Sequence, residues 1–185
     1  MFGGTHDGDN PVERSVSPLQ EGSWARCVGA EVVPYAEARI VPSFQTAESA
    51  YNAWWSLQDG QVPYQQQLDP LNFGPKLLPH LSIIDVIQHG ADYRWRLSGE
   101  KANEAIGLSL RGRFLSEIEA LQPDQALYRS LLDQVIRSCE PLFYVIRYST
   151  VSGCRKRSYG VLLPLMTMFE ESASRRILVQ CILGA

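Results

Sequence analysis

Residues 92–98, DYRWRLS, alternate strictly between apolar and polar side chains, and this pattern restricts the fold more than any other stretch. Such alternation is typical of a β-strand with one buried face, because successive side chains point to opposite sides of a sheet. The preceding run LSIIDVI, 81–87, is apolar and rich in β-branched residues, and the intervening QHGA has hairpin length and contains glycine. We therefore predict an antiparallel hairpin whose inner face carries Tyr93, Trp95 and Leu97, and whose outer face carries Arg94, Arg96 and Ser98.

Helical periodicity and strand-like runs define the rest of the domain. Residues 46–60 place apolar side chains at helical spacing, and residues 123–140 form the strongest amphipathic helix of the chain. Three strand-like runs close the chain, joined by short polar linkers that favour an antiparallel meander, at 142–151, 155–167 and 175–184. This order predicts an α+β fold with one five-stranded antiparallel sheet, helices on one face and an N-terminal flanking helix.

The chain length of 185 residues suits one domain, which we assign to residues 46–185 with the helix 46–60 at its start. Residues 1–45 are predicted to be a flexible or extended N-terminal segment, because their first half is rich in glycine, serine, proline and charge. Within this segment, residues 25–45 are compatible with a short strand or an extended arm, since Pro34 and Pro42 limit regular structure.

Charge and hydropathy exclude several classes of protein. The net charge is −3, so the chain lacks the basic excess by which nucleic acid is attracted through bulk electrostatics. No apolar run approaches the about 20 residues of a membrane-spanning helix, and the N-terminus lacks the basic start and apolar core of a secretory signal. We therefore expect a cytoplasmic protein without a membrane partner, in which the four cysteines stay reduced.

A more specific pattern runs through residues 69–118. Its pieces are Asp69-Pro70, Leu77–Leu81, Asp85, Tyr93–Leu97, Gly99, Gly107 and Gly112–Ile118. In this arrangement the chain resembles a PAS-like family widespread in alphaproteobacteria, whose order of elements also matches residues 46–185. Glu100, where the family commonly has threonine, and Leu108–Leu110 depart from the family pattern but leave the fold expectation intact. The resemblance implies a sensory or regulatory module of signal transduction and implies no particular ligand.

PAS domains that bind certain cofactors have characteristic binding residues, and two of these are missing here. Haem-binding members usually supply an axial histidine from the long helix, and flavin photosensors use a reactive cysteine after the glycine turn. Residues 101–138 contain neither histidine nor cysteine. Haem bound in that way and cysteinyl-flavin photochemistry are therefore not expected, and the cofactor stays unknown. His80 and His89 are separated by a whole strand, so no metal site is predicted.

No catalytic motif is present, because the sequence lacks a serine nucleophile elbow, a phosphate loop and a dinucleotide fingerprint. The alternative to a regulatory module is a small ketosteroid isomerase-like enzyme, whose cone-shaped α+β fold needs an acidic residue or histidine facing a pocket. Asp85 is the candidate, and we expect it to pair with Arg94 or Arg96 across the hairpin. An inward-facing, desolvated Asp85 in an open pocket would favour the enzyme, whereas an Asp85 at the surface that pairs with arginine would favour the regulatory module.

The inner face of the sheet is the candidate site for a small apolar ligand. Alternation and helical spacing nominate Ile84, Val86, Tyr93, Trp95, Leu97, Phe114, Ile118, Tyr144, Ile146, Val161, Leu163 and Val179. The same residues would equally form a filled core with no ligand, and the sequence leaves both alternatives open.

A second candidate surface lies on the helix at 46–60, where we predict a dimer interface of Ala53, Trp54, Trp55 and Leu57. Adjacent residues of a helix point in directions about 100° apart, so one tryptophan can pack on the sheet while the other stays available to a partner. Flanking helices often mediate dimerisation in PAS-like proteins, so the resemblance implies a homodimer. A helix that only covers its own core is the alternative. Because no output domain is recognisable, we also expect a protein partner in a signalling pathway.

Overall fold

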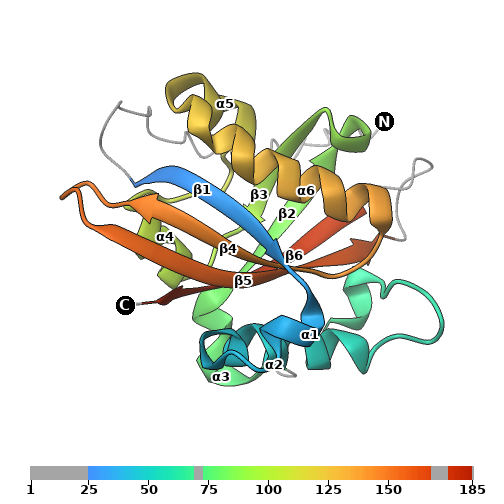
Figure 1. Ribbon diagram of the computed structural model, residues 1–185. Coiled ribbons are helices and arrows are strands. Elements are labelled where there is room, and N and C mark those ends of the chain that lie inside the picture. The colour runs from blue at the N-terminus through green and yellow to red at the C-terminus, as the bar shows by residue number, and fades with distance from the viewer. Residues whose placement is uncertain (1–24, 69–72, 168–174, 185) are drawn as a thin grey trace, which may run out of the picture.

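In the computed structural model, strands from both ends of the chain form one antiparallel sheet in the order β1-β4-β5-β6-β2-β3 (Figure 1). The structure describes residues 25–68, 73–167 and 175–184, the last of these for the backbone only, so Asp69 and Pro70 lie outside the described residues. The strands are β1 (Arg26–Val33), β2 (Leu81–Ile87), β3 (Asp92–Leu97), β4 (Leu142–Ser149), β5 (Arg155–Met166) and β6 (Arg175–Gly184).

The hairpin predicted from residues 81–98 is confirmed. β2 and β3 pair antiparallel, with Ile84 opposite Trp95 and Val86 opposite Tyr93, and these four side chains are buried. Ile83 lies opposite Leu97 and Ile84 opposite Trp95, so the register shifts at a bulge on β3. The closing three strands also pair antiparallel in sequence order, β4 with β5 and β5 with β6, as the short linkers predict.

The predicted count of five strands is corrected by β1. This strand pairs with β4 from Arg26 opposite Ser149 to Val33 opposite Phe143, so the described part of the segment assigned to 1–45 contributes a sixth strand. Pro34 follows the last residue of β1, where it ends the strand without removing any of its hydrogen-bond donors. β1 covers the edge of β4, whose backbone groups would otherwise lack partners in the sheet.

Helices pack on both faces of the sheet, which corrects the prediction of helices on one face. We call the two sides the α6 face, covered by α4, α5 and α6, and the α2 face, covered by α1, α2 and α3 (Figure 1). Consecutive residues of β4, such as Leu142 and Phe143, point to opposite faces and are both buried, so each face needs its own cover. The helices are α1 (Tyr35–Ala38), α2 (Gln45–Trp55), α3 (Gly74–Leu77), α4 (Glu100–Ile106), α5 (Leu115–Leu121) and α6 (Ala126–Ser138).

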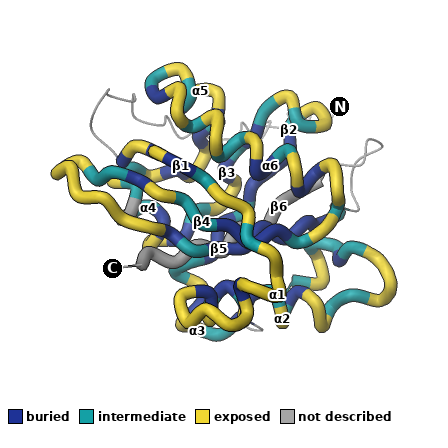
Figure 2. Tube along the Cα trace, viewed as in Figure 1, coloured by how far each residue is buried: buried dark blue, intermediate teal, exposed yellow. Residues whose placement is uncertain are grey.

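The two longest helices follow the apolar spacing of their sequences. α6 begins after the turn at Pro123–Gln125 and ends at Cys139, whose φ of 55° is left-handed and stops the helix. One stripe of α6 is buried, and the buried positions of α2 are likewise confined to the side that faces the sheet (Figure 2). Among the residues that the structure describes, no helix is long and apolar enough to cross a membrane.

Candidate functional site

The α6 face contains a cavity of about 100 Å³ between the sheet and its helices. Its walls come from segments far apart in the sequence, namely β1, the start of β2, β3, β4, β5, α4, α5 and the start of α6. The lining is mostly apolar, with Ile106 at the end of α4, Leu110 in the segment after it and Ile118 from α5. A concave apolar space with a few polar groups is the usual form of a small-molecule site.

Aromatic rings form one wall of this cavity. The Tyr128 ring of α6 stacks on Trp95 of β3 with the centroids 6.1 Å apart and the planes 12° apart. The same tyrosine ring meets Tyr144 of β4 edge-on, at a centroid distance of 6.4 Å. Tyr148, four residues after Tyr144 on β4, also borders the cavity. A flat, polarisable wall of this kind suits a planar or aliphatic guest.

A few polar side chains interrupt the apolar lining. Ser82 and Ser158 are buried at the cavity wall, and Cys27 reaches it from β1. Burial raises the pKa of the Cys27 thiol, which therefore stays protonated at neutral pH and is a poor nucleophile. The wall can thus offer hydrogen-bonding groups and a weakly polar thiol to a ligand, but it does not offer an activated thiolate.

Gly99 allows α4 to approach the sheet closely enough to close the cavity. The Gly99 N–H donates to the Ser82 hydroxyl oxygen over 3.2 Å, and a Cβ at position 99 would collide with the backbone carbonyl oxygens of Pro79 and Leu81. The end of α4 is held in turn by β1, because the Ala25 N–H donates to the Ile106 carbonyl oxygen over 2.7 Å. α4 is therefore attached to the sheet near both of its ends.

Charged groups fasten α6 and α5 to the hairpin above the cavity. Arg129 of α6 donates to both carboxylate oxygens of Glu119 in α5 at 2.7 to 2.9 Å, and to Asp92 of β3 at 3.2 Å. Asp92 also accepts from the Ser116 hydroxyl at 2.6 Å and from the Tyr93 N–H at 2.8 Å. Burial alone would raise the pKa of Asp92, but these hydrogen bonds outweigh it and lower that pKa.

A second polar contact joins the same elements inside the core. The Tyr93 hydroxyl donates to Asp133 of α6 over 2.5 Å, and the Arg129 guanidinium lies 5.5 Å from the centroid of the Tyr93 ring. Burial and the neighbouring Asp133 carboxylate raise the pKa of Tyr93, so this phenol stays protonated across the physiological range. Tyr93 is thus a fixed hydrogen-bond donor that anchors α6.

Some residues nominated for the ligand site line the cavity. Trp95, Ile118, Tyr144 and Ile146 are in its wall. Ile84, Val86 and Tyr93 belong to the apolar cluster of the same α6 face, but they do not border the cavity. The seven residues therefore lie on the α6 face, and four of them, including Ile118 of α5, line the cavity.

Other nominated residues are placed elsewhere by the structure. Val161 and Leu163 point to the α2 face, because the residue of β5 opposite Leu142 is Leu162 and their own positions are one residue out of phase. Leu97 is 44% exposed at the end of β3, beyond the bulge. Phe114 is half-buried outside the cavity, with the Arg94 guanidinium 5.8 Å from its ring centroid. The side chain of Val179 lies outside the described residues.

Sequence reasoning missed the lining residues contributed by β1 and by the first turn of α6. Ala25 and Cys27 were missed because their segment was not assigned to the sheet. Tyr128 could have been predicted from helical spacing, because it lies three and four residues before the buried Leu131 and Leu132 and shares their face of the helix.

Asp85 is not in the cavity. It lies between Ile84 and Val86, which face the α6 side, so its side chain points to the opposite face of β2. Its carboxylate pairs with Arg94 across the hairpin at 2.9 Å, which confirms the predicted pair. The acidic residue required by the ketosteroid isomerase-like alternative therefore does not face the cavity.

The two adjacent tryptophans of α2 differ in burial. Trp54 is fully buried against the sheet and its indole N–H donates to the Pro164 carbonyl oxygen over 2.9 Å, so it is unavailable to a partner. Trp55 is 56% exposed, and its ring lies 5.8 Å from the Tyr51 ring, which in turn lies 4.8 Å from Tyr35. We call these three residues the aromatic strip. Ala53 and Leu57 are half-buried beside it.

Comparison with known proteins gives one match. A family model described as a PAS domain covers residues 43–178, which is most of the chain. No curated protein and no solved structure matches.

Proposed function

Because this chain belongs to the PAS domain family, we propose that it is a regulatory module that senses a small, largely apolar molecule in the cavity of the α6 face. PAS domains are typically sensory rather than catalytic, so a regulatory role is the starting expectation for this chain. The observation that carries the proposal is the cavity itself. The cavity has a volume of about 100 Å³ and an aromatic wall. It lies between the sheet and α6, the helix that would transmit binding of a ligand.

The size and lining of the cavity limit the ligand. An apolar cavity of about 150 Å³ is large enough to bind benzene, so the present cavity suits a molecule no larger than a single ring or a short branched chain. Trp95 and Tyr128 supply the flat surface, and Ser82, Ser158 and Cys27 supply polar atoms to the wall. A flavin or a haem is far larger than a cavity of about 100 Å³ can hold.

α6 is the element that would transmit occupancy of the cavity. Tyr128 lies in the cavity wall, and the next residue, Arg129, holds both Glu119 of α5 and Asp92 of β3. A ligand that displaces the Tyr128 ring would therefore move the helix that carries these charged contacts. A change of this kind would reach the surface of the domain through α5 and the hairpin.

We further propose that the aromatic strip, Tyr35, Tyr51 and Trp55, contacts a second copy of this chain. Trp55 leaves more than half of its surface exposed, and an exposed indole next to two tyrosines is an unusual surface for a monomer. Two-fold dimers are the most common assemblies, and a two-fold axis would pack each strip against its equivalent. Ala53 and Leu57 would lie at the rim, and Trp54 would support the strip from below.

Native mass spectrometry of gently purified protein tests both parts of the proposal. We expect a dimer that carries a discrete extra mass per chain, and we expect this mass to be lost on denaturation. Ala102→Phe, which fills the cavity from α4, should abolish the extra mass, whereas Ala120→Phe on the exposed side of α5 should retain it. Trp55→Ala should give monomers that still carry the ligand.

The outcomes separate the two parts. Wild-type protein without extra mass, or Ala102→Phe with the same extra mass as wild type, would contradict the ligand in this cavity. A monomeric wild-type protein would contradict the dimer but not the ligand.

A further inference from the structure

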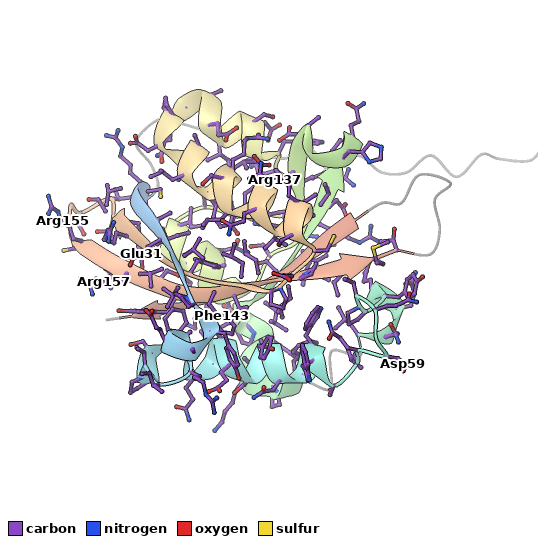
Figure 3. The ribbon with its side chains drawn as sticks, turned by 45° about the vertical axis from the view of Figure 1, so that its right-hand side comes forward. Glu31, Asp59, Arg137, Phe143, Arg155 and Arg157 are labelled. Carbon is purple, nitrogen blue, oxygen red and sulfur yellow. The ribbon has the colours of Figure 1, made fainter. Side chains whose placement is uncertain are left out.

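The β4–β5 hairpin carries an unusual concentration of positive charge. Residues 141–167 include four basic side chains and no acidic ones, in a chain whose net charge is −3. The basic residues are Arg147 on β4 and Arg155, Lys156 and Arg157 at the start of β5, and all four are exposed. Arg155 and Arg157 lie at the end of the sheet, beyond the helices of both faces (Figure 3).

Strand register places three of these side chains on one face, and we call Arg147, Arg155 and Arg157 the arginine patch. Arg157 lies directly opposite Arg147, and Arg155 lies two residues away on the same side of β5. Like charges directly opposite each other destabilise a pair of strands, so this arrangement does not serve the stability of the sheet. It brings three guanidinium groups together on one surface.

The charge of the patch is only partly compensated. Arg147 lies across Gly29, where a Cβ would be 2.8 Å from the guanidinium, and it reaches Glu31 of β1 at 3.5 Å. The side chains of Arg155 and Arg157 make no hydrogen bond or ion pair with any residue that the structure describes. Two guanidinium groups therefore keep their full capacity to donate hydrogen bonds to an anionic partner.

The turn next to the patch is well ordered by its own hydrogen bonds. The Thr150 hydroxyl oxygen accepts from the Cys154 N–H at 3.1 Å and lies 2.9 Å from the Ser152 hydroxyl oxygen, and Gly153 adopts a left-handed φ of 80°. At the tip of this turn Val151 is 64% exposed. The hairpin thus presents an apolar contact and a row of arginines on one fixed frame.

We propose that the arginine patch docks an extended acidic segment of a partner protein. Arg155 and Arg157 are two residues apart on one strand, about 7 Å, which equals the spacing of alternate side chains on an extended peptide. The guanidinium fork matches a carboxylate in two parallel hydrogen bonds, which favours acidic side chains held at that spacing. An apolar residue next to the acidic pair would contact Val151. None of these residues lines the cavity, so this surface is separate from the proposed ligand site.

A protein segment fits these observations better than the other polyanions. The patch is small, and the chain as a whole is negative, so a nucleic acid would be repelled by most of the remaining surface. Anionic membrane surfaces attract larger basic clusters, of about four to eight residues, and usually together with several apolar side chains. Here three arginines on a rigid strand accompany one exposed valine.

Fluorescence anisotropy with the full chain tests the proposal. The probe is a dye-labelled peptide of about eight residues with glutamate at alternate positions, and the control probe has glutamine at those positions. We expect saturable binding of the glutamate peptide that weakens as salt is raised. Arg155→Ala/Arg157→Ala should weaken it about tenfold or more, because charge-assisted hydrogen bonds are lost. The affinity of Arg155→Lys/Arg157→Lys for the peptide should lie between that of wild type and that of the double alanine variant, because lysine keeps the charge but cannot form the two parallel hydrogen bonds of a guanidinium group.

A matched variant controls for net charge. Lys76→Ala/Arg111→Ala removes the same two charges from exposed positions outside the hairpin and should bind the peptide like wild type. Equal binding of the glutamine peptide, or equal weakening in the control variant, would overturn the proposal.

Three further outcomes would assign the patch to another occupant. Tighter binding of a single-stranded oligonucleotide or of phosphatidylserine vesicles than of the peptide would assign it to a nucleic acid or a membrane. Stronger peptide binding by Asp7→Asn/Asp9→Asn/Glu13→Gln would show that acidic residues of the same chain compete for the patch, and would overturn a separate protein as its natural occupant.

Discussion

The α2 face and the α6 face share the strands of one sheet, yet they are held in different ways. On the α2 face, Trp54 is fully buried and the rings of Phe44, Phe143 and Tyr159 pack edge to face at 5.2 to 6.0 Å. On the α6 face, Tyr128 and its neighbours leave a cavity of about 100 Å³. The helices of the first face are fixed chiefly by aromatic packing, whereas those of the second combine a hollow core with charged contacts.

This difference indicates which side of the domain can respond to a ligand. Close packing resists small displacements, because each atom moved loses contacts that nothing replaces. The helices above the cavity are tied down by Arg129, Asp92 and Glu119, whose hydrogen bonds fix direction and position without filling space. A guest in the cavity can therefore change the packing beneath α6 while these contacts keep the helix attached.

The largest expected effect on stability comes from a substitution that disrupts the aromatic packing of the α2 face. Trp54→Ala removes a fully buried indole and leaves the Pro164 carbonyl oxygen without its donor. We expect a loss of about 3–5 kcal/mol in the free energy of unfolding, measured by urea denaturation. Trp55→Ala is the matched control, and at a protein concentration where the chain is monomeric it should cost less than about 1 kcal/mol because its ring is mostly exposed. Similar losses in both variants would contradict the role assigned to Trp54.

A smaller effect is expected from the charged contacts of the α6 face. Asp92→Asn weakens the hydrogen bonds from Ser116 and Arg129, and should lower the free energy of unfolding by about 1–2 kcal/mol at neutral pH. The folded pKa of Asp92 lies below its ordinary value of 3.8, so the stabilisation is complete above that pH and is lost as the pH falls through the folded pKa. The difference between wild type and variant should therefore shrink as the pH is lowered towards about 2.

Urea denaturation at neutral and acidic pH measures this difference, and Asp59→Asn on the exposed loop after α2 serves as the control (Figure 3). The control should match wild type at both pH values. A loss at Asp92 that is equal at both pH values would show that its carboxylate charge contributes nothing to the attachment of α6.

The two faces also differ in how far the sequence predicts them. The hairpin β2–β3 and the stripe of α6 are predicted correctly, because strict alternation and helical spacing each allow one orientation. β5 is apolar at consecutive positions from Val161 to Leu163, so the sequence pattern does not indicate which of these side chains faces which side of the sheet. Its phase is set by pairing with β4, where Leu162 lies opposite Leu142. Val161 and Leu163 were therefore placed on the wrong face.

The cavity could be predicted only in part for a related reason. Trp95 and Tyr144 were identified from their strands, but an empty space depends on the summed volumes of side chains from many elements. The contribution of β1 depends on a long-range pairing with β4 that no local pattern specifies. Ala25 and Cys27 could have been found only by recognising that β4 needs a neighbour on its outer edge.

The smallest expected effect concerns the start of β5, where Arg155 and Arg157 lie beyond the helices of both faces (Figure 3). Arg157→Glu replaces one of two like charges that lie directly opposite each other and creates an attractive pair with Arg147. We expect the free energy of unfolding to rise by about 0.2–1 kcal/mol, and the gain to shrink at high salt, because cross-strand charge pairs have this magnitude and are screened. Arg111→Glu changes the net charge equally on a different exposed segment and should give no comparable gain. If urea denaturation shows that Arg157→Glu lowers the free energy of unfolding, then Arg157 stabilises the fold. The arginines would then not be retained at a cost to the stability of the sheet, and the main physical reason for assigning a binding role to the arginine patch would be removed.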